Sequence, residues 1–258
     1  MSVHIATQSP TSGLPPMIPL PFPTAPHIVS PLNGPWDYWR PAGSRIVELG
    51  TVRGLDVALP VHFHDEDQMT FVLSGRRRFV IGGERADAGP GQGVIIPART
   101  PHRSLTDTAE VVCINMYLPP GAYGGPEVIA ALARHWRRTG GVGWADLMLI
   151  AEDHRCTTTI IAEPAQDSPD GEPWETVDRM ARRAGLTREG FTRRFTRLHG
   201  VPPHTFSLLE KLNAARRRLR AGEAIAGVAA DTGFTDQSHL GRCFRRAFGV
   251  TPGQYRTR

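Results

Sequence analysis

The sequence predicts an α+β protein of two domains, an all-β barrel followed by an all-α domain with two helix-turn-helix units. A chain of 258 residues is long enough for two such domains. Short apolar runs between glycine and proline turns precede Leu118, whereas helical spacing dominates after Pro126. Residues 1–175 hold 13 basic and 19 acidic side chains, and residues 176–258 hold 17 and 6. This asymmetry favours a polyanionic partner for the helical part, with a solvated basic surface as the alternative.

Composition divides the chain into four segments. Residues 1–40 are predicted to be a flexible proline-rich arm, because nine of the 23 prolines lie in the first 35 residues. Residues 41–120 form the predicted barrel, residues 121–152 a helical segment for coupling or dimerisation, and residues 153–258 the basic helical domain.

The sequence also argues against several locations and chemistries. No run approaches the roughly 18 apolar residues that span a bilayer, so we expect no membrane partner. The first basic residue is Arg40, which fits neither a secretory signal nor a transit peptide, and a cytoplasmic location follows as an expectation. Cys113, Cys156 and Cys243 lie far apart and are predicted to be buried, reduced thiols.

The strand assignments come from short apolar or alternating runs. They are Met69–Leu73, Arg78–Ile81, Gly93–Ile96 and Val111–Leu118, separated by glycine-containing turns. Within the basic run 76–78, alternation sends Arg77 to the face opposite Arg76 and Arg78. We favour a solvated face for this trio.

An amphipathic helix is predicted directly after the barrel. Val128, Ile129, Leu132 and Trp136 fall on one helical face, and a second helical piece follows Gly140. Such a stripe has to be covered, either by a second subunit or by the chain's own barrel and helical domain. Residues 157–161 are β-branched and remain ambiguous between strand and helix.

The first helix-turn-helix unit spans Val177 to Gly200. Its first helix ends near Gly185, and the Thr187 hydroxyl is placed to cap a second helix. Phe191, Phe195 and Leu198 are predicted to form the buried stripe of that second helix. Forked arginine donors suit guanine edges and phosphates, so the opposite face is assigned to DNA. The candidate DNA-binding residues here are Arg188, Thr192, Arg193 and Arg197.

The second unit repeats this plan around a turn at Gly233. Leu240, Cys243, Phe244 and Phe248 are expected to face inward. Side chains at the helix start enter a groove most deeply and favour base edges, and the later arginines favour phosphates. Candidate DNA-binding residues are Asp236, Gln237, Ser238, His239, Arg242, Arg245 and Arg246. For Arg242, bracing of the fold is an equal alternative.

The run from Gly233 to Arg256 resembles the signature of AraC/XylS-type transcriptional regulators, G-F-x-x-x-S-x-F-x-R-x-F-K-x-x-x-G-x-x-P-x-x-Y-R. Leu240 replaces the usual Phe and Arg245 the usual Lys. The resemblance extends through about the last hundred residues, with Arg194 where a leucine is more usual. It implies binding of double-stranded DNA, a homodimer and contact with RNA polymerase.

A histidine group marks the predicted barrel. His62 and His64 lie two residues apart and are expected to face the interior from one strand, where His102 can join them. Three imidazoles with the Gln68 carbonyl oxygen suit zinc, iron, nickel or copper. The alternative is that His62, His64, Gln68 and His102 line an effector pocket or satisfy one another. No cofactor is required in that case.

The region from Arg45 to Leu118 resembles a cupin domain. His62-Phe63-His64 with Gln68 and Gly75 follows the first cupin motif, G-x5-H-x-H-x3-4-E-x6-G, with Gln68 in place of Glu. Gly91 to His102 follows the second motif, with Arg99 in place of its second glycine. The resemblance implies a ligand-sensing barrel.

These patterns together predict a ligand-responsive DNA-binding transcriptional regulator without a catalytic step. The first rival is a metal-dependent cupin enzyme with a DNA-binding tail, which needs open coordination positions on its metal. The second is a constitutive DNA-binding protein whose barrel only mediates dimerisation. The effector, the operator and the direction of regulation do not follow from the fold.

Overall fold

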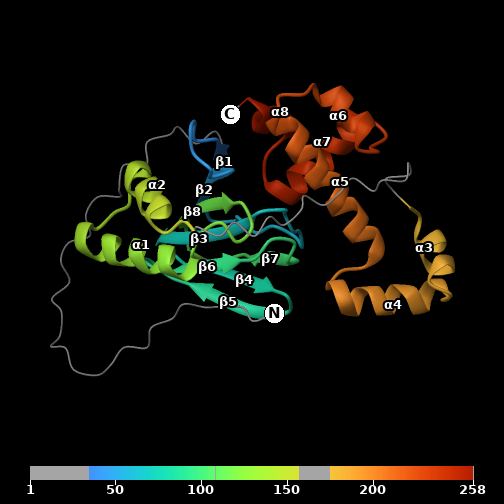
Figure 1. Ribbon diagram of the computed structural model, residues 1–258, viewed down its shortest axis with the longest axis horizontal. Coiled ribbons are helices and arrows are strands. Elements are labelled where there is room, and N and C mark those ends of the chain that lie inside the picture. The colour runs from blue at the N-terminus through green and yellow to red at the C-terminus, as the bar shows by residue number, and fades with distance from the viewer. Residues whose placement is uncertain (1–34, 108, 157–174, 258) are drawn as a thin grey trace.

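The computed structural model describes residues 35–107, 109–156 and 175–257. Most of the predicted arm, residues 1–34, and the ambiguous run 157–161 lie outside the described residues. The described part has the predicted class, a strand-rich domain followed by helices (Figure 1). None of its helices combines the length and the apolar character needed to cross a membrane.

Two antiparallel sheets form the N-terminal domain. The larger sheet has the order β1-β2-β8-β3-β6, and the smaller sheet has the order β5-β4-β7. The eight strands are β1 (Trp36–Trp39), β2 (Glu48–Gly54), β3 (Asp67–Ser74), β4 (Arg77–Ile81), β5 (Glu84–Ala88), β6 (Gly93–Ile96), β7 (His102–Leu105) and β8 (Val111–Leu118). All four strands predicted from apolar runs are present.

Strand alternation separates two different faces of the larger sheet. On β3, Met69 and Phe71 belong to the apolar cluster under the following helices, whereas Gln68 and Thr70 lie on the opposite, inner face. The inner face of β8 likewise carries the buried polar residue Asn115. A buried polar group of Gln68, Thr70 and Asn115 therefore lies among the apolar side chains between the two sheets.

Strand β1 lies within the stretch that composition assigned to the arm. It pairs with β2 from Trp36↔Val52 to Trp39↔Leu49. Trp36 and Tyr38 are buried, and their rings stack with centroids 6.4 Å apart. Burial of two large aromatic rings outweighs the proline-rich context that favoured an extended arm.

Two helices cover the outer face of the larger sheet. They are α1 (Gly125–Thr139) and α2 (Trp144–Asp153). Val128, Ile129 and Leu132 are at most 3% exposed, in one cluster with Met69 and Phe71. The apolar stripe proposed for dimerisation is thus covered by the chain's own barrel.

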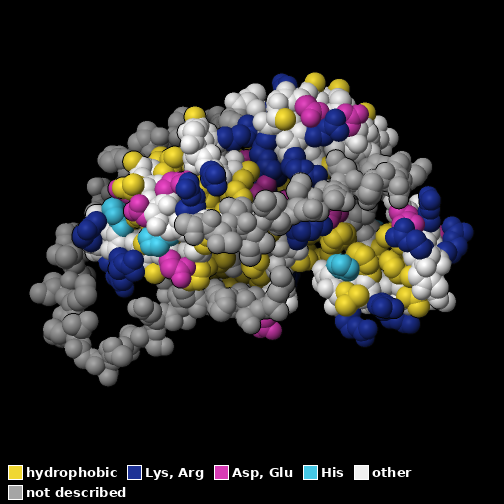
Figure 2. All heavy atoms as spheres, viewed as in Figure 1, with side chains coloured by type: hydrophobic (Ala, Val, Ile, Leu, Met, Phe, Trp, Pro, Cys, Tyr) yellow, Lys and Arg dark blue, Asp and Glu magenta, His cyan; other side chains and the backbone are white. Residues whose placement is uncertain are grey.

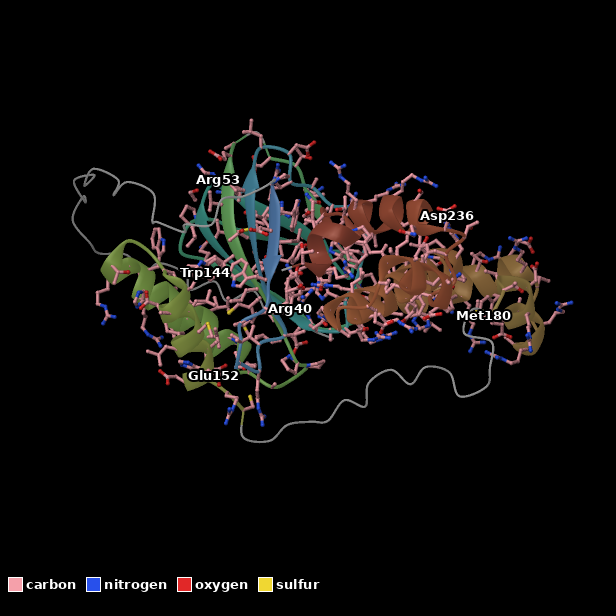
Figure 3. All side chains as sticks on the ribbon, turned by 90° about the horizontal axis from the view of Figure 1, so that it is seen from above. Arg40, Arg53, Trp144, Glu152, Met180 and Asp236 are labelled. Atoms are coloured by element: carbon pink, nitrogen blue, oxygen red, sulfur yellow. The ribbon has the colours of Figure 1, made fainter. Side chains whose placement is uncertain are left out.

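The remaining helices form the C-terminal domain at the opposite end from α2, as Figures 1 and 3 show. The first unit contains α3 (Val177–Arg183) and α4 (Arg188–His199), and the second contains α6 (Ile225–Asp231) and α7 (Gln237–Phe248). Helix α5 (Pro203–Arg220) connects the units, and α8 (Pro252–Arg256) follows α7. Thr187 and Asp236 cap α4 and α7 by accepting from the amides of Gly190 and His239.

Candidate functional site

The three predicted histidines converge inside the barrel. His62, His64 and His102 are buried, and one ring nitrogen from each lies within 4.8 Å of the others. His102 begins β7, but His62 and His64 precede β3 in a segment where only His62 makes a bridge, to His102. The prediction of a common strand for the pair was wrong, although the expected convergence is present.

Backbone carbonyls fix the orientation of each ring. These contacts join Nδ1 to a main-chain oxygen two residues away: His62 to Pro60 at 2.8 Å, His64 to Glu66 at 2.9 Å and His102 to Thr100 at 2.9 Å. A carbonyl only accepts, so Nδ1 carries the hydrogen in each neutral ring and Nε2 keeps a lone pair. Metal-binding histidines are oriented in the same way.

Gln68 completes the donor set. Its amide nitrogen donates to the Thr70 hydroxyl at 2.9 Å and to Asn115 Oδ1 at 3.3 Å, and Thr70 donates to Asn115 at 2.7 Å. Its Oε1 therefore faces His64 Nε2, 2.7 Å away. Because Gln68 Oε1 and His64 Nε2 both present lone pairs, a proton or a cation is required between the two atoms. His102 Nε2 is buried without a hydrogen-bond partner among the described residues. The donor set fits a divalent metal.

The electrostatics of the site favour neutral imidazoles. Burial, followed by the neighbouring rings, lowers the pKa of His62 and His64 well below the ordinary value. Burial lowers the pKa of His102 to about 4. Neutral imidazole is the form that coordinates metals, so the three rings need no deprotonation to do so.

Arg77 on β4 also faces the barrel interior. It is 2% exposed, and its guanidinium lies 5.4 Å from the Trp36 ring and 5.3 Å from the Phe79 ring. Its neighbours Arg76 and Arg78 form ion pairs on the opposite face, with Asp87 at the surface and with partly buried Asp107. The prediction of a solvated face was wrong for Arg77, because strand alternation turns this one side chain inward.

The C-terminal domain packs on the end of the barrel near the histidines. The His62 ring lies 6.3 Å from the ring of Phe248 in α7, edge to face. The Tyr38 hydroxyl donates to the Phe248 carbonyl at 2.8 Å, and Asn213 of α5 donates to the Phe63 carbonyl at 3.0 Å. Sequence reasoning missed this interface, since its partners lie more than 140 residues apart and share no local pattern.

A buried ion cluster joins α5 to the barrel. Arg216 is 1% exposed and pairs with Glu48 of β2, which is fully buried. Arg216 Nη1 is also 3.7 Å from Glu66, and Arg220 pairs with Glu66 at 2.6 Å. Burial opposes the charge of Glu66, but Arg216 and Arg220 lower its pKa below the ordinary value. The carbonyl of Glu66 holds His64, so one residue contacts both the histidine group and the connecting helix.

Arg99 adds a further contact between the domains. It stands where the second cupin motif has glycine, and its φ of +60° is the only positive value outside glycine among the described residues. A side chain at this φ costs about 1–3 kcal/mol. Here the guanidinium pairs with Asp65 at 3.1 Å and with Glu210 of α5. The departure from the motif thus provides an ion pair to the connecting helix.

The candidate DNA-binding residues lie on α4, at the α7 N-cap and along α7. Thr192 and His239 are partly buried, and the others are exposed: Arg188, Arg193, Arg197, Asp236, Gln237, Ser238, Arg242, Arg245 and Arg246. Arg188 also lies 3.5 Å from Asp178. Figure 2 shows Lys and Arg side chains gathered over the part of the molecule formed by α3 and α4. These surfaces are open to a large partner.

The predicted buried stripe of α4 is only half formed. Phe191 and Phe195 are partly buried, but Leu198 is 67% exposed. Its burial was predicted wrongly, because α3 and α5, the helices against which α4 mainly packs, leave this side chain uncovered. In α7, by contrast, Leu240, Phe244 and Phe248 are buried as predicted, whereas Cys243 is only partly buried.

Comparisons with known proteins support both domains. Residues 56–117 match a cupin domain model, and residues 180–258 match a helix-turn-helix domain model. The HTH-type transcriptional regulator MtrA of Neisseria gonorrhoeae is 34% identical over 91 residues, 35% of this chain and 30% of MtrA. The activator RclR of Escherichia coli is 33% identical over 91 residues, 34% of this chain and 31% of RclR. The chain thus matches about a third of the length of these relatives.

A solved structure extends the likeness to both domains. Fatty-acid-bound ToxT from Vibrio cholerae covers 86% of this chain and 94% of its own, with a TM-score of 0.50 and 10% identity. At this identity the likeness concerns the fold alone. It supports the order of a barrel followed by a helical domain.

Proposed function

We propose that this chain, which joins a cupin domain to an AraC-type helix-turn-helix domain, is a DNA-binding transcriptional regulator controlled by an effector in the barrel. The observation that carries the proposal is the buried cluster of Arg216, Glu48 and Glu66. Through this cluster, α5 pairs with Glu66, whose carbonyl orients His64. Helix α5 also connects the two DNA-binding units. A change in the barrel therefore has a physical route to the spacing of the units.

Recognition of DNA is assigned to α4, the α7 N-cap and α7. Gln237 at the start of α7 and Arg193 on α4 have exposed side chains suited to adenine and guanine edges. Arg245 and Arg246 lie in the last turn of α7 and are assigned to phosphates. The net basic charge of residues 176–258 supports a steep loss of affinity with added salt.

The test is selection of bound fragments from a genomic library by the full chain, followed by binding titrations on the selected site. Arg245→Ala is expected to weaken specific and random DNA alike and to reduce the salt slope by about one. The matched control is Arg53→Ala, which removes an exposed charge on the barrel. It is expected to change neither the DNA affinity nor the salt slope. Equal binding of selected and random fragments by the full chain would refute sequence-specific recognition.

We further propose that His62, His64, His102 and Gln68 hold a divalent metal. When bound, the metal supplies a Lewis-acid centre for a carbonyl or carboxylate group of a ligand. The residues themselves orient the site, through the three Nδ1 contacts to carbonyls and the amide contacts of Gln68. Metal analysis of the full chain and of His62→Ala/His64→Ala checks this. Equal metal content in both proteins, with the variant folded, contradicts it.

This donor set also favours a second candidate function, a metal-dependent cupin enzyme carrying a DNA-binding domain. The curated relatives support regulation, and their names describe transcription regulators and an activator. Turnover of a substrate by the metal-loaded chain, abolished in His62→Ala/His64→Ala, would favour the enzyme. A change in DNA affinity on metal or effector binding, without turnover, favours the regulator.

A homodimer, contact with RNA polymerase and a cytoplasmic location remain predictions from the resemblance and the sequence. The apolar stripe of α1 is covered by the barrel, so a dimer needs another surface. Leu149 on α2 is a candidate for that surface, because its apolar side chain is 64% exposed. Sedimentation of the full chain and of Leu149→Lys at equal concentration tests whether α2 contributes. Unchanged association in the variant would exclude this helix.

A further inference from the structure

Arg77 is a buried cation whose charge no described residue balances. Its side chain contacts the rings of Trp36 and Phe79, and among the described residues it makes neither a hydrogen bond nor an ion pair. Aromatic rings attract a guanidinium but carry no net charge. An arginine in such a site lacks the carboxylate that normally accompanies a buried charge.

The other ionisable groups near Arg77 are neutral. Burial raises the pKa of Cys113 to about 11 and the pKa of Tyr117 to about 12. None of these groups supplies a negative charge at neutral pH.

Two buried carboxylates of the barrel, Glu48 and Glu66, are engaged by other cations. Glu48 pairs with Arg216, and Glu66 pairs with Arg216 and Arg220. Both acids therefore balance the cations of α5. The positive charge of Arg77, on the smaller sheet, is therefore not balanced by Glu48 or Glu66.

The side chain of Arg77 points into the interior between the two sheets. On β4, Arg77, Phe79 and Ile81 alternate inward, and Ile81 pairs with His102 on β7. Arg77 and the histidine group therefore lie on the same inner face, four residues apart along the ladder.

We propose that the barrel binds a small organic carboxylate, whose carboxylate group forms a two-pronged ion pair with Arg77. A planar guanidinium fork matches the two oxygens of a carboxylate. The flat rings of Trp36 and Phe79 suit an aromatic or short aliphatic body. The inference deepens the proposed function, on which it rests, by naming the chemical class of the effector.

The test uses thermal unfolding of the full chain, stripped of metal on a chelating resin, at constant total ionic strength. The probes are acetate, benzoate and inorganic phosphate, with chloride as the reference salt. Benzoate is expected to raise the midpoint saturably, by roughly 2–4 °C for each tenfold increase above its dissociation constant. Acetate should act in the same way at higher concentration. Stabilisation by phosphate alone would overturn the carboxylate assignment.

Two variants separate binding from a structural role. Arg77→Met keeps the length of the side chain and removes the unbalanced charge, so its midpoint in chloride should equal or exceed that of the unmodified protein, while its benzoate response disappears. Arg76→Met removes the exposed neighbouring charge and should respond normally. A benzoate response that persists in Arg77→Met would overturn the proposal.

Arg77→Lys keeps the inference testable if Arg77→Met does not fold. It retains the charge without the fork, and calorimetric titration should show benzoate binding weakened by at least tenfold. Unchanged affinity would overturn the role of the fork. These measurements involve no DNA, so their failure concerns the effector class alone, whereas failure of fragment selection concerns the proposed regulator.

Discussion

Helix α7 of the second unit buries Leu240, Phe244, Ala247 and Phe248, whereas α4 of the first unit has no fully buried residue. Both helices have twelve residues, begin after a side-chain cap and end at a left-handed glycine. The units differ in their surroundings. Helix α7 packs against α5, α6, α8 and the barrel, and α4 packs against α3 and α5. Equal aromatic spacing in the sequence thus produces unequal burial, because neighbours far along the chain decide it.

The second unit is also attached to the barrel more directly than the first. The Gly249 turn after α7 lies against Trp36, so close that a Cβ atom there would approach the ring to 2.5 Å. Its φ of +79° is also the left-handed conformation that glycine favours. The second unit is therefore seated on the barrel. The first unit packs on α5, and α5 pairs with the barrel through Arg99 and Glu210.

The largest expected effect comes from truncating the aromatic core of α7. Phe244→Ala removes a fully buried ring and should lower the free energy of unfolding by about 3–5 kcal/mol. Phe195→Ala, the matched change in α4, removes a partly buried ring and should cost roughly 1 kcal/mol. Urea unfolding of the full chain measures both. Equal losses would show that the two units are packed alike.

A slightly smaller effect is expected from the buried ion cluster. Glu48→Gln leaves Arg216 buried without its charge partner, and about 3 kcal/mol of stability should be lost. The matched change in the first unit is Glu175→Gln, which faces the exposed side chains of Arg179 and Arg183. It should cost no more than about 1 kcal/mol. Urea midpoints that shift by the same amount would remove the distinction between the attachments.

Much of the fold was predictable because its signals are local. Glycine turns and apolar runs located β3, β4, β6 and β8, and helical spacing located α1 and α7. Strand β5 (Glu84–Ala88) was missed, since its burial pattern leaves three of five residues exposed. Strand β1 was missed because two buried rings stabilise it against a proline-rich context.

The candidate site was predictable only in part. The spacing of His62 and His64 with His102 indicated their convergence, which the structure has. Strand alternation separated Arg77 from Arg76 and Arg78, but a run of three arginines is normally solvated, so the burial of Arg77 was not predicted. The contacts of Arg216 with Glu48 and Glu66 depend on the packing of two domains, and no local pattern encodes that packing.

Intermediate effects are expected at the surfaces assigned to DNA. Gln237→Ala in the second unit and Arg193→Ala in the first should each cost about 1–3 kcal/mol on the selected site and relax preference at different base pairs. Because the second unit is seated on the barrel, the Gln237→Ala loss should depend on the effector less than the Arg193→Ala loss does. Competition titrations with single-base variants, with and without benzoate, measure this. The reverse order would contradict a fixed second unit.

The smallest effect is expected at Leu198 of α4. This side chain is 67% exposed, so Leu198→Lys should change the free energy of unfolding by at most about 0.5 kcal/mol. In α7, by contrast, Leu240→Ala should cost about 2–5 kcal/mol, because Leu240 is fully buried. If Leu198→Lys instead destabilises the chain or changes its sedimentation, α4 has a partner surface over Leu198. In that case a partner covers α4 in the assembled protein, and the low burial of α4 in the single chain is explained by the absence of that partner.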